Sequence, residues 1–336
     1  ISHIHGWEPA VERILNAANT KIILFSSNAR VVSEALSAVR CGEYDIVHAL
    51  PLSLEEFIFF QDFQELTPPD VGVPERRYSR FETGNYGIDE IYKHYILYGG
   101  LPILKPEYMD TERARVVMDG TYSAVVVRDI LESSGVSGVS TITDPILLRS
   151  VITIMARSIG DNISATWVGK QTAELLGRPS STKTIESYMR ALLNAHLFYI
   201  AERYDIVADK QLKTLAKYYV VDAGLHNYLT GVKASDEKRL LENKIFFELL
   251  RRGYQVYNGK LGRDEITLIA MKGDDRVYIQ VAYDADLEKM LLPLRKIRDN
   301  HPKVVISMKN ESQKTKDGIH VLNALSFLMG ASYNDR

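Results

Sequence analysis

Four polar side chains recur in the middle of the sequence at a spacing that suits contact with a polyanion. Lys183, Thr184, Ser187 and Arg190 alternate with apolar residues that recur at helical spacing over positions 185–193. On a helix these four side chains would share the exposed face, where cations and hydroxyl groups can contact phosphates and base edges. The spacing therefore makes them DNA-binding candidates, provided that the neighbouring elements present this helix to solvent.

The elements expected around this helix are two further helices and a hairpin. Asp144 and Pro145 indicate the start of a first helix over 145–159, a second is expected from 164 or 166 to 176, and residues 180–182 cap the third. Strands at 197–203 and 218–221 follow, joined by a loop that holds Lys210 and Lys213. This order is typical of a winged helix-turn-helix, so Lys210 and Lys213 join the candidates for DNA binding.

The charge balance of this region leaves two interpretations open. Positions 180–217 hold six basic and four acidic side chains, a surplus of only two charges. The whole chain of 336 residues has a formal net charge of −2, so a nucleic-acid site would have to be a local patch. Winged helices also serve as packing modules, and the sequence permits either role.

Composition excludes several classes of protein. Hydrophobic residues make up 46% and charged residues 25% of the chain, as in ordinary globular proteins. The single cysteine, Cys41, rules out an intramolecular disulfide, which favours a cytoplasmic location. No apolar run reaches the roughly 18 residues of a membrane span, so no membrane partner is expected. The chain begins at Ile1 rather than Met, and we expect a processed or truncated N-terminus.

The first 60 residues are predicted to alternate between helices and strands. Helices are expected at 7–18 and 29–39, strands at 21–25 and 44–50, and a helix after Ser53, where Glu56 can complete a capping box. Asn28 follows the first strand, at the sheet edge where ligands bind in open α/β proteins. Two strands are too few for a complete sheet, so this segment would be only part of an α/β core.

Beyond this segment the sequence predicts a loop over 67–85 and helices at 88–97 and 112–131. We interpret the later stretch 203–225 as the last strand of one domain and the hinge into the next. The elements expected after it are a helix at 240–252, strands at 254–257, 265–271 and 276–283, a helix at 286–298, a strand at 304–308 and a terminal helix at 321–329. Up to the last strand, this αβββαβ order is that of restriction-endonuclease-like folds.

Several segments resemble one family of prokaryotic proteins. They are residues 51–57, 99–102, 204–205, 210–214, 217–225 and 241–249, and the resemblance runs nearly end to end. The chain is similar to AAA-type P-loop ATPases that carry a winged helix and a C-terminal nuclease-like domain of unknown function. The resemblance implies an α/β multidomain chain: the C-terminal part of an AAA-type core at 1–63, a helical lid at 64–140, a winged helix at 141–232 and a nuclease-like domain at 233–336.

Nucleotide binding in this family depends on motifs that the present sequence does not contain. Family members begin with a P-loop, G-x-x-x-x-G-K-S/T, whose amides and lysine bind phosphates, followed by a strand that ends in Asp-Glu. Residues 1–7 resemble what comes directly after that Asp-Glu. ATP and Mg²⁺ are therefore implied for an intact family member, and no cofactor is expected from these residues. Asn28 stands where the family's sensor asparagine polarises the attacking water, although a strand-end cap is the alternative.

The nuclease-like segment also departs from an active site. A nuclease of this kind uses a helix glutamate, a strand aspartate and a Glu-x-Lys pair to bind Mg²⁺ and activate water. Glu242 stands at the helix position, but Thr267 replaces the aspartate, and Gln280 and Ala282 replace the Glu-x-Lys pair. One carboxylate with an amide and a hydroxyl is a weak ligand set for Mg²⁺. We expect no cleavage and no metal site, with Glu242 as a helix-surface or structural residue.

The expected function is that of an AAA-type ATP-binding protein of unknown cellular role, in which the residues present are non-catalytic and contact DNA through the winged helix. The first alternative is a catalytically decayed scaffold that binds DNA or another protein. The second is a PD-(D/E)XK-type nuclease, against which the replaced positions argue. The partners implied are DNA, a protein partner or a second copy of this chain.

Overall fold

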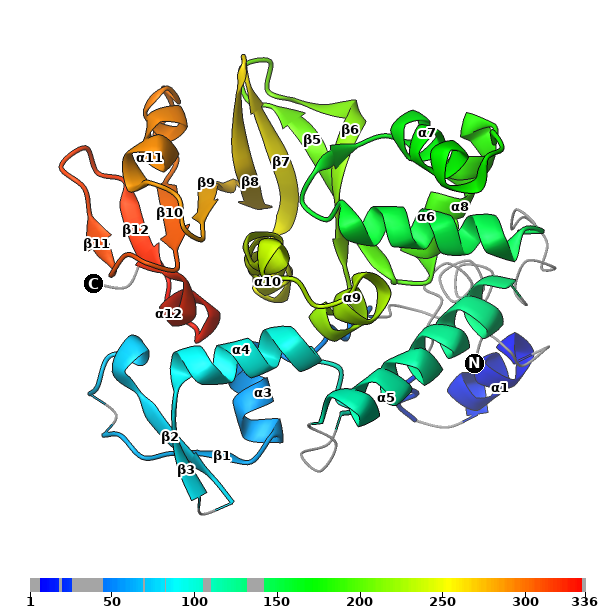
Figure 1. The fold of residues 1–336 in the computed structure, drawn as a ribbon, viewed down its shortest axis with the longest axis horizontal. Helices are drawn as coiled ribbons and strands as arrows, with labels where there is room; N and C mark the ends of the chain where they lie inside the picture. Colours follow the sequence, from blue (N-terminus) through cyan, green and yellow to red (C-terminus); the bar gives the residue numbers. More distant parts are fainter. Residues whose placement is uncertain are drawn as a thin grey trace.

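The computed structural model describes residues 7–17, 20–25, 45–68, 70–81, 83–104, 110–131 and 142–333. Helices alternate along these residues with the strands of two sheets, which makes the protein α/β (Figure 1). Within these ranges no helix is both long and apolar enough to cross a membrane.

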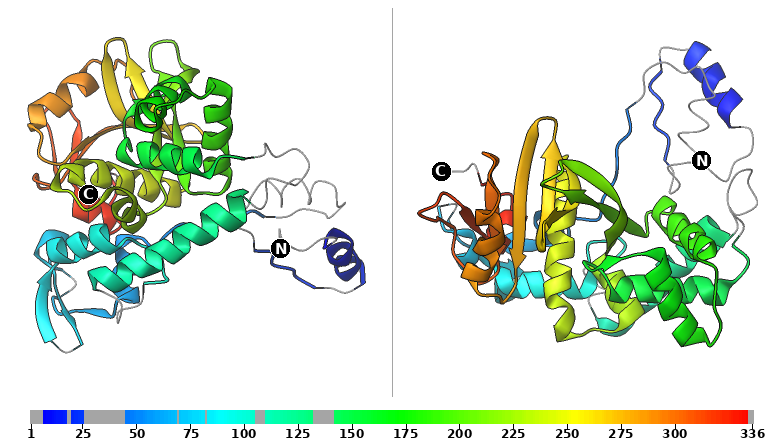
Figure 2. Two further views of the ribbon diagram at one scale, coloured as in Figure 1. Left: turned by 45° about the vertical axis from the view of Figure 1, so that its right-hand side comes forward. Right: turned by 90° about the horizontal axis from the view of Figure 1, so that it is seen from above.

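The N-terminal segment contains the helix α1 (Glu8–Ala17), which confirms the helix expected at 7–18 and lies apart from the main sheet (Figure 2). The strand expected at 21–25 is wrong, because these residues are irregular and Phe25 is 80% exposed. The strand expected at 44–50 is also wrong over its described part, 45–50, where Val47 is 88% exposed. A strand needs a neighbour to pair its backbone groups, and neither run has one in the described sheets. Asn28 and the helix expected at 29–39 lie outside the described residues.

A small three-stranded sheet follows the helix α3 (Leu54–Phe60). The expected capping box forms: the Ser53 hydroxyl accepts from the Glu56 N–H (3.1 Å), and the Glu56 carboxylate accepts from the Ser53 N–H (2.7 Å). The loop expected at 67–85 is wrong in part, because the central strand of this sheet lies within it. Proline and glycine mark the turns between these elements rather than one continuous loop. The elements are β1 (Phe63–Glu65), the 3-10 helix η1 (Val73–Glu75), β2 (Arg77–Arg80) and β3 (Thr83–Gly87), with β2 antiparallel to both other strands.

Two helical segments connect this small sheet to the rest of the chain. Helix α4 (Ile88–Tyr98) confirms the helix expected at 88–97, and Gly99 ends it with a φ of 83°. Helix α5 (Thr111–Ser123) continues into a π-helical segment, η3 (Ala124–Leu131), so the helix expected at 112–131 is also confirmed.

The three helices and the hairpin expected around the polar face are present. They are α6 (Pro145–Arg157), α7 (Ala165–Leu176), α8 (Thr182–Asn194), β5 (Phe198–Asp205) and β6 (Lys210–Val220). Each helix begins after a side chain that accepts a backbone N–H from its first turn. Lys210 and Lys213 lie on β6, so their expected position in a loop is wrong. The turn between the strands is short because the Asp205 carboxylate accepts the N–H groups of Val207 and Ala208, 3.1 Å each.

The C-terminal elements follow the expected order as far as β10. They are α9 (Ala223–Thr230), the 3-10 helix η5 (Ala234–Asp236), α10 (Glu237–Arg251), β7 (Gln255–Leu261), β8 (Asp264–Lys272), β9 (Asp275–Ala282), α11 (Leu287–Arg295), β10 (Lys303–Ser307), β11 (Gln313–Lys314), β12 (His320–Asn323) and α12 (Ala324–Leu328). The helix expected at 321–329 is wrong in its first half, because β12 pairs in parallel with β10 there. The helix starts only after Asn323, whose side chain caps it.

One nine-stranded mixed sheet runs through both the hairpin and the C-terminal strands. Its order is β11-β12-β10-β9-β8-β7-β5-β6-β4, where β4 is Asn162–Ile163. The junction is a parallel pairing of β5 with β7, in which Asp205 lies opposite Lys260, and the two side chains form an ion pair of 3.0 Å. The stretch 203–225, which we interpreted as containing a hinge, therefore starts inside a shared sheet.

Helices α10 and α11 cover opposite faces of this sheet. Along β9, Val277 and Ile279 belong to the core that includes α10, whereas Tyr278 belongs to the core that includes α11. This alternation follows from the two-residue period of a strand. A further core holds α5 to α9 together.

Asp222 joins the end of α4 to the start of α9. Its buried carboxylate accepts the N–H groups of Gly100 (2.6 Å) and Gly224 (2.8 Å). A Cβ at Gly99 would lie 1.9 Å from this carboxylate, and one at Gly224 would lie 2.2 Å from the Tyr98 carbonyl oxygen. The backbones of the two segments can therefore approach this closely only because both positions are glycine and carry no Cβ.

Lys244 on α10 is a buried cation near this junction. Its ammonium group lies 3.6 Å from the centre of the Tyr95 ring, and the residue is only 5% exposed. Burial lowers the pKa of Lys244 to about 8, a shift that the Asp222 carboxylate opposes and the Arg251 guanidinium reinforces. The folded chain therefore binds this proton less tightly than an unfolded chain does.

We predict that Lys244 makes the free energy of unfolding rise with pH between about 8 and 10.5, because in this range the unfolded state binds more protons. From pH 7.5 to 9.5 the wild type should gain about 2 kcal/mol relative to Lys244→Met, which has no proton to lose there. Urea denaturation at both pH values measures this difference. The exposed control Lys183→Met should follow the wild type, and identical pH profiles for wild type and Lys244→Met would contradict the prediction.

Candidate functional site

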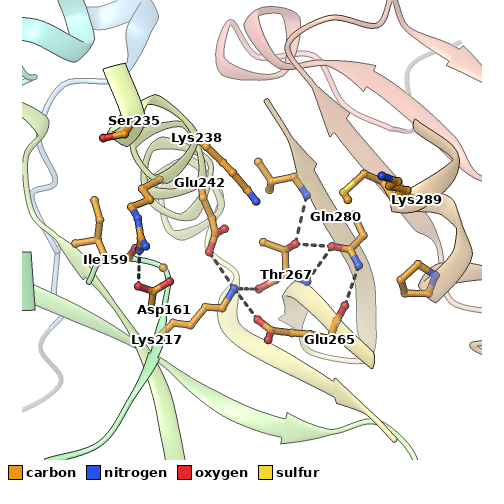
Figure 3. A pocket seen from close by; sticks show the side chains of 15 residues that line it. Ile159, Asp161, Lys217, Ser235, Lys238, Glu242, Glu265, Thr267, Gln280 and Lys289 are labelled. Atoms are coloured by element: carbon orange, nitrogen blue, oxygen red, sulfur yellow. Dashed lines mark hydrogen bonds and ion pairs between the residues drawn. The ribbon is translucent and has the colours of Figure 1, made fainter. Parts of the chain in front are cut away.

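A pocket of about 540 Å³ opens between α10, α11 and the strands β6, β8 and β9 (Figure 3). Glu242, Thr267 and Gln280 all line it, so the structure brings these three sequence-predicted residues together. Ala282 is not among the lining residues and packs in the core on the α11 side of the sheet.

The ammonium group of Lys217, from β6, lies among protein oxygen atoms in this pocket. Its Nζ is 3.1 Å from Glu242 Oε1, 2.9 Å from Glu265 Oε1 and 3.5 Å from the Thr267 carbonyl oxygen, and its side chain is 5% exposed. Burial alone would lower the pKa of Lys217, but the carboxylates of Glu242 and Glu265 outweigh it and raise that pKa above its ordinary value. The site thus contains a charged cation of its own.

Glu242 points inward from α10 and is buried. Of the two expected roles, helix-surface or structural, the surface role is wrong, because the carboxylate forms an ion pair with Lys217 and also accepts the Tyr219 hydroxyl at 2.8 Å. Burial, followed by the negative charge of Glu242, raises the pKa of Tyr219 well above its usual value. Tyr219 is accordingly a permanent hydrogen-bond donor to this carboxylate.

Thr267 and Gln280 are bound to each other rather than open to a ligand. The Thr267 hydroxyl donates to the Gln280 side-chain oxygen, and the Gln280 amide donates to the Glu265 carbonyl oxygen at 2.9 Å. Mg²⁺ requires charged oxygen ligands in octahedral geometry, and here both carboxylates already face an ammonium group. These residues do not fit a Mg²⁺ site. Over the described ranges, no group of three His, Cys, Asp or Glu side chains could hold a metal.

Residues 159–161 close one side of the pocket. Gly160 has a φ of 75°, and a Cβ there would lie 3.1 Å from Glu242 Oε1. Asp161 forms an ion pair of 2.6 Å with Arg239, which also donates to the Ile159 carbonyl oxygen at 2.8 Å. Asp161 is therefore matched by a cation of its own, whereas Glu242 and Glu265 share the single ammonium group of Lys217.

The DNA-binding candidates of α8 lie outside this pocket. Lys183 and Arg190 are exposed, as a recognition face requires. The Thr184 hydroxyl is hydrogen-bonded to that of Ser181 at 2.8 Å, and Ser187 is half-buried. Lysine and arginine are thus the accessible members of the set.

The two remaining basic candidates, Lys210 and Lys213, are exposed on β6. They do not line the pocket either, so the structure does not bring the DNA-binding and nuclease-like positions together. Asn28 lies outside the described residues, and its role as a nucleotide sensor stays a prediction.

Sequence reasoning missed Lys217 and Glu265 as members of the site. A signal for Lys217 was present, because it is two residues before Tyr219 in a strand and so shares the buried face of that tyrosine. A lysine on a buried strand face requires a partner, and that need pointed to a carboxylate elsewhere in the chain. Glu265 had a similar signal, because it stands two residues before the candidate Thr267 in one strand and so shares its face, although its side chain is 46% exposed.

The structure is that of an α/β protein in which a lysine ammonium group contacts both carboxylates of the candidate site. Comparison with known proteins gives its family. The chain is 32% identical over 335 residues to an uncharacterized protein of Haemophilus influenzae, covering 98% of this chain and 76% of that protein. It belongs to the same family as that protein.

Two further comparisons reach less far. Residues 89–236 match the domain of unknown function DUF8612. An uncharacterized protein of Methanocaldococcus jannaschii is 23% identical over 293 residues, which span 84% of this chain and 60% of that protein. No solved structure matches the chain.

We predict that Lys217→Met lowers the free energy of unfolding by about 3–5 kcal/mol, because it leaves the Glu242 carboxylate buried without its counter-ion. Adding Glu242→Gln should restore part of this loss, so the free energy of unfolding of the double variant should fall by less than the sum of the two single losses. Urea denaturation of the four proteins gives the coupling energy. Lys238 is an exposed lysine of the same pocket, and Lys238→Met should lower the free energy of unfolding by less than about 0.5 kcal/mol. A loss no larger than that for Lys217→Met would contradict the prediction.

Proposed function

We propose that this chain is the DNA-contacting part of an AAA-type ATP-binding protein, and that its nuclease-like domain does not cleave. The winged helix of this proposal consists of α6, α7, α8 and the β5–β6 hairpin. The nuclease-like domain consists of the elements from α10 to β10. A cytoplasmic location is part of the proposal, since Cys41 is the single cysteine.

The observation that carries the proposal is the position of Lys217. A metal-dependent nuclease needs a divalent cation between its carboxylates to activate water. Here the ammonium group faces Glu242, Glu265 and the Thr267 carbonyl oxygen. An ammonium ion offsets one of the two carboxylate charges but offers no coordination position to water. The arrangement supports a nuclease scaffold that retains its shape without the chemistry of cleavage.

DNA contact is supported by the exposed face of α8. Lys183 and Arg190 are seven residues apart, close to two helical turns, and so lie on one side of the helix. Neither forms an ion pair with another residue in the described ranges. Both charges are therefore available to phosphate groups.

The ATPase part of the proposal is supported by two exposed apolar runs. Ile23 and Phe25 are 77% and 80% exposed, and Val47 is 88% exposed. Side chains of this kind are normally covered when their segment is a central strand of a sheet. Both runs are irregular in the structure, and we propose that they become strands only beside further strands of an AAA-type core. The sequence has no glycine-rich phosphate loop, so these residues do not themselves fit an ATP site.

A protein-interaction scaffold is the second candidate. It is favoured by the pairing of β5 with β7, which ties the end of the hairpin to the sheet. A hairpin held in this way is less free to enter a DNA groove than the wing of a separate module. Binding experiments on α8 separate the two candidates.

We predict that the chain shifts a 30-base-pair duplex at low salt, where phosphate contacts are strongest. The double variant Lys183→Ala/Arg190→Ala should bind about tenfold or more weakly and show a smaller salt dependence, because two phosphate contacts are lost. The matched control is Lys309→Ala, which removes an exposed lysine just after β10. An electrophoretic shift assay with a salt series measures all three proteins; absence of any shift at low salt would favour the scaffold.

We also predict that supercoiled plasmid stays intact with Mg²⁺ or Mn²⁺, because Lys217 holds the place of the cation. Wild type and Glu242→Gln should give the same background nicking over hours. Agarose gel electrophoresis checks this result. Nicking by the wild type that disappears in Glu242→Gln would show that the site is a nuclease after all.

A further inference from the structure

Two lysines from different helices line the pocket and give it the features of a second kind of site. Lys238 extends from α10 and Lys289 from α11, and both line the pocket (Figure 3). Both are exposed, and within the described part of the chain neither forms an ion pair or side-chain hydrogen bond. They therefore differ from Lys217, whose charge is already matched inside the protein.

The remaining charges of the pocket are engaged with one another. Glu242 and Glu265 face Lys217, and Asp161 faces Arg239. Glu242 and Glu265 together carry one negative charge more than Lys217 offsets, so with Lys238 and Lys289 the lining holds four basic against three acidic side chains, a surplus of one positive charge.

The two wall helices also carry carboxylates, and these are engaged elsewhere. Glu237 at the start of α10 accepts the Tyr283 hydroxyl, and Glu288 on α11 pairs with Arg295 at 2.7 Å. Neither residue lines the pocket. The field inside the pocket therefore favours an anion over a cation.

We propose that this pocket binds a nucleotide through its phosphate group, held between Lys238 and Lys289. Ammonium groups on two walls suit a phosphate, which can accept charge-assisted hydrogen bonds from both. A volume of about 540 Å³ is that of a small-molecule site. Met290 and Pro293 of α11 add apolar lining against which a base or sugar can rest. Thr267 and Gln280, which also line the pocket, compete little for the two ammonium groups, because they are hydrogen-bonded to each other.

The phosphate has two sources with the same chemistry: a free nucleotide, or the phosphorylated end of a nucleic-acid strand. This inference rests on the part of the proposed function in which Lys217 takes the place of a metal ion between the carboxylates. It does not depend on DNA contact by α8. A failure of the α8 variants to change DNA binding would therefore leave it standing.

The test is isothermal titration of the full chain at low ionic strength with AMP, adenosine and inorganic phosphate. AMP should bind at least tenfold more tightly than adenosine, and inorganic phosphate should compete with it. Lys238→Met/Lys289→Met should weaken AMP at least tenfold, whereas Lys309→Met should leave it unchanged. The proposal would be overturned if AMP and adenosine bound equally tightly, or if AMP bound equally tightly to the wild type and the double variant. Absence of binding of both AMP and oligonucleotide at millimolar concentration would also overturn it.

A tetranucleotide with and without a 5′-phosphate distinguishes the two sources. Tighter binding of the phosphorylated tetranucleotide than of AMP identifies a strand end as the ligand, and weaker binding identifies the free nucleotide. Unfolding midpoints for each variant establish that lost affinity comes from the lysines rather than from misfolding. Lys183→Ala/Arg190→Ala should retain AMP binding, which keeps this result separate from that of α8.

Discussion

The ion cluster of Lys217, Glu242 and Glu265 is the interaction on which the arrangement of the chain depends most. It joins a strand of the hairpin, a helix and a strand of the C-terminal segment around one buried ammonium group. Charges removed from water are tolerated only when each is matched, so the three elements have little freedom to move independently. The neighbouring Gly160 allows the backbone to approach the same carboxylate, which seals the cluster from one side.

A second junction, centred on Asp222, holds the helical part of the chain against this sheet. The carboxylate binds backbone N–H groups on both sides of the contact between α4 and α9, and Asn227 adds a hydrogen bond to the Ile96 carbonyl oxygen at 2.9 Å. The DUF8612 match ends at residue 236, one residue before α10 begins. Yet the core that contains α4 also contains α10 and the C-terminal strands. The matched region therefore shares its hydrophobic core with the segment that follows it.

Local features of the fold could be predicted from the sequence, and long-range ones could not. Asp144, Ser164 and Ser181 fix the starts of three helices because a cap and its N–H partner are three residues apart. Strand limits depend on neighbours that sequence does not reveal, which is why residues 21–25 were wrongly assigned and β6 was predicted too short. The candidate site shows the same division. Glu242 was found through the family resemblance, which implies a helix glutamate at this position, but its partner Lys217 is 25 residues away and was missed.

The sharing of β5 between two partners has a mechanical consequence. This strand is hydrogen-bonded to β6 on one edge and to β7 on the other, and α8 packs in the same core as its first residue, Phe198. Tension applied at the polar face of α8 would pass as shear through backbone hydrogen bonds into the C-terminal strands. A connection through paired strands is stiff, so the two halves of the sheet would tilt together rather than rotate independently.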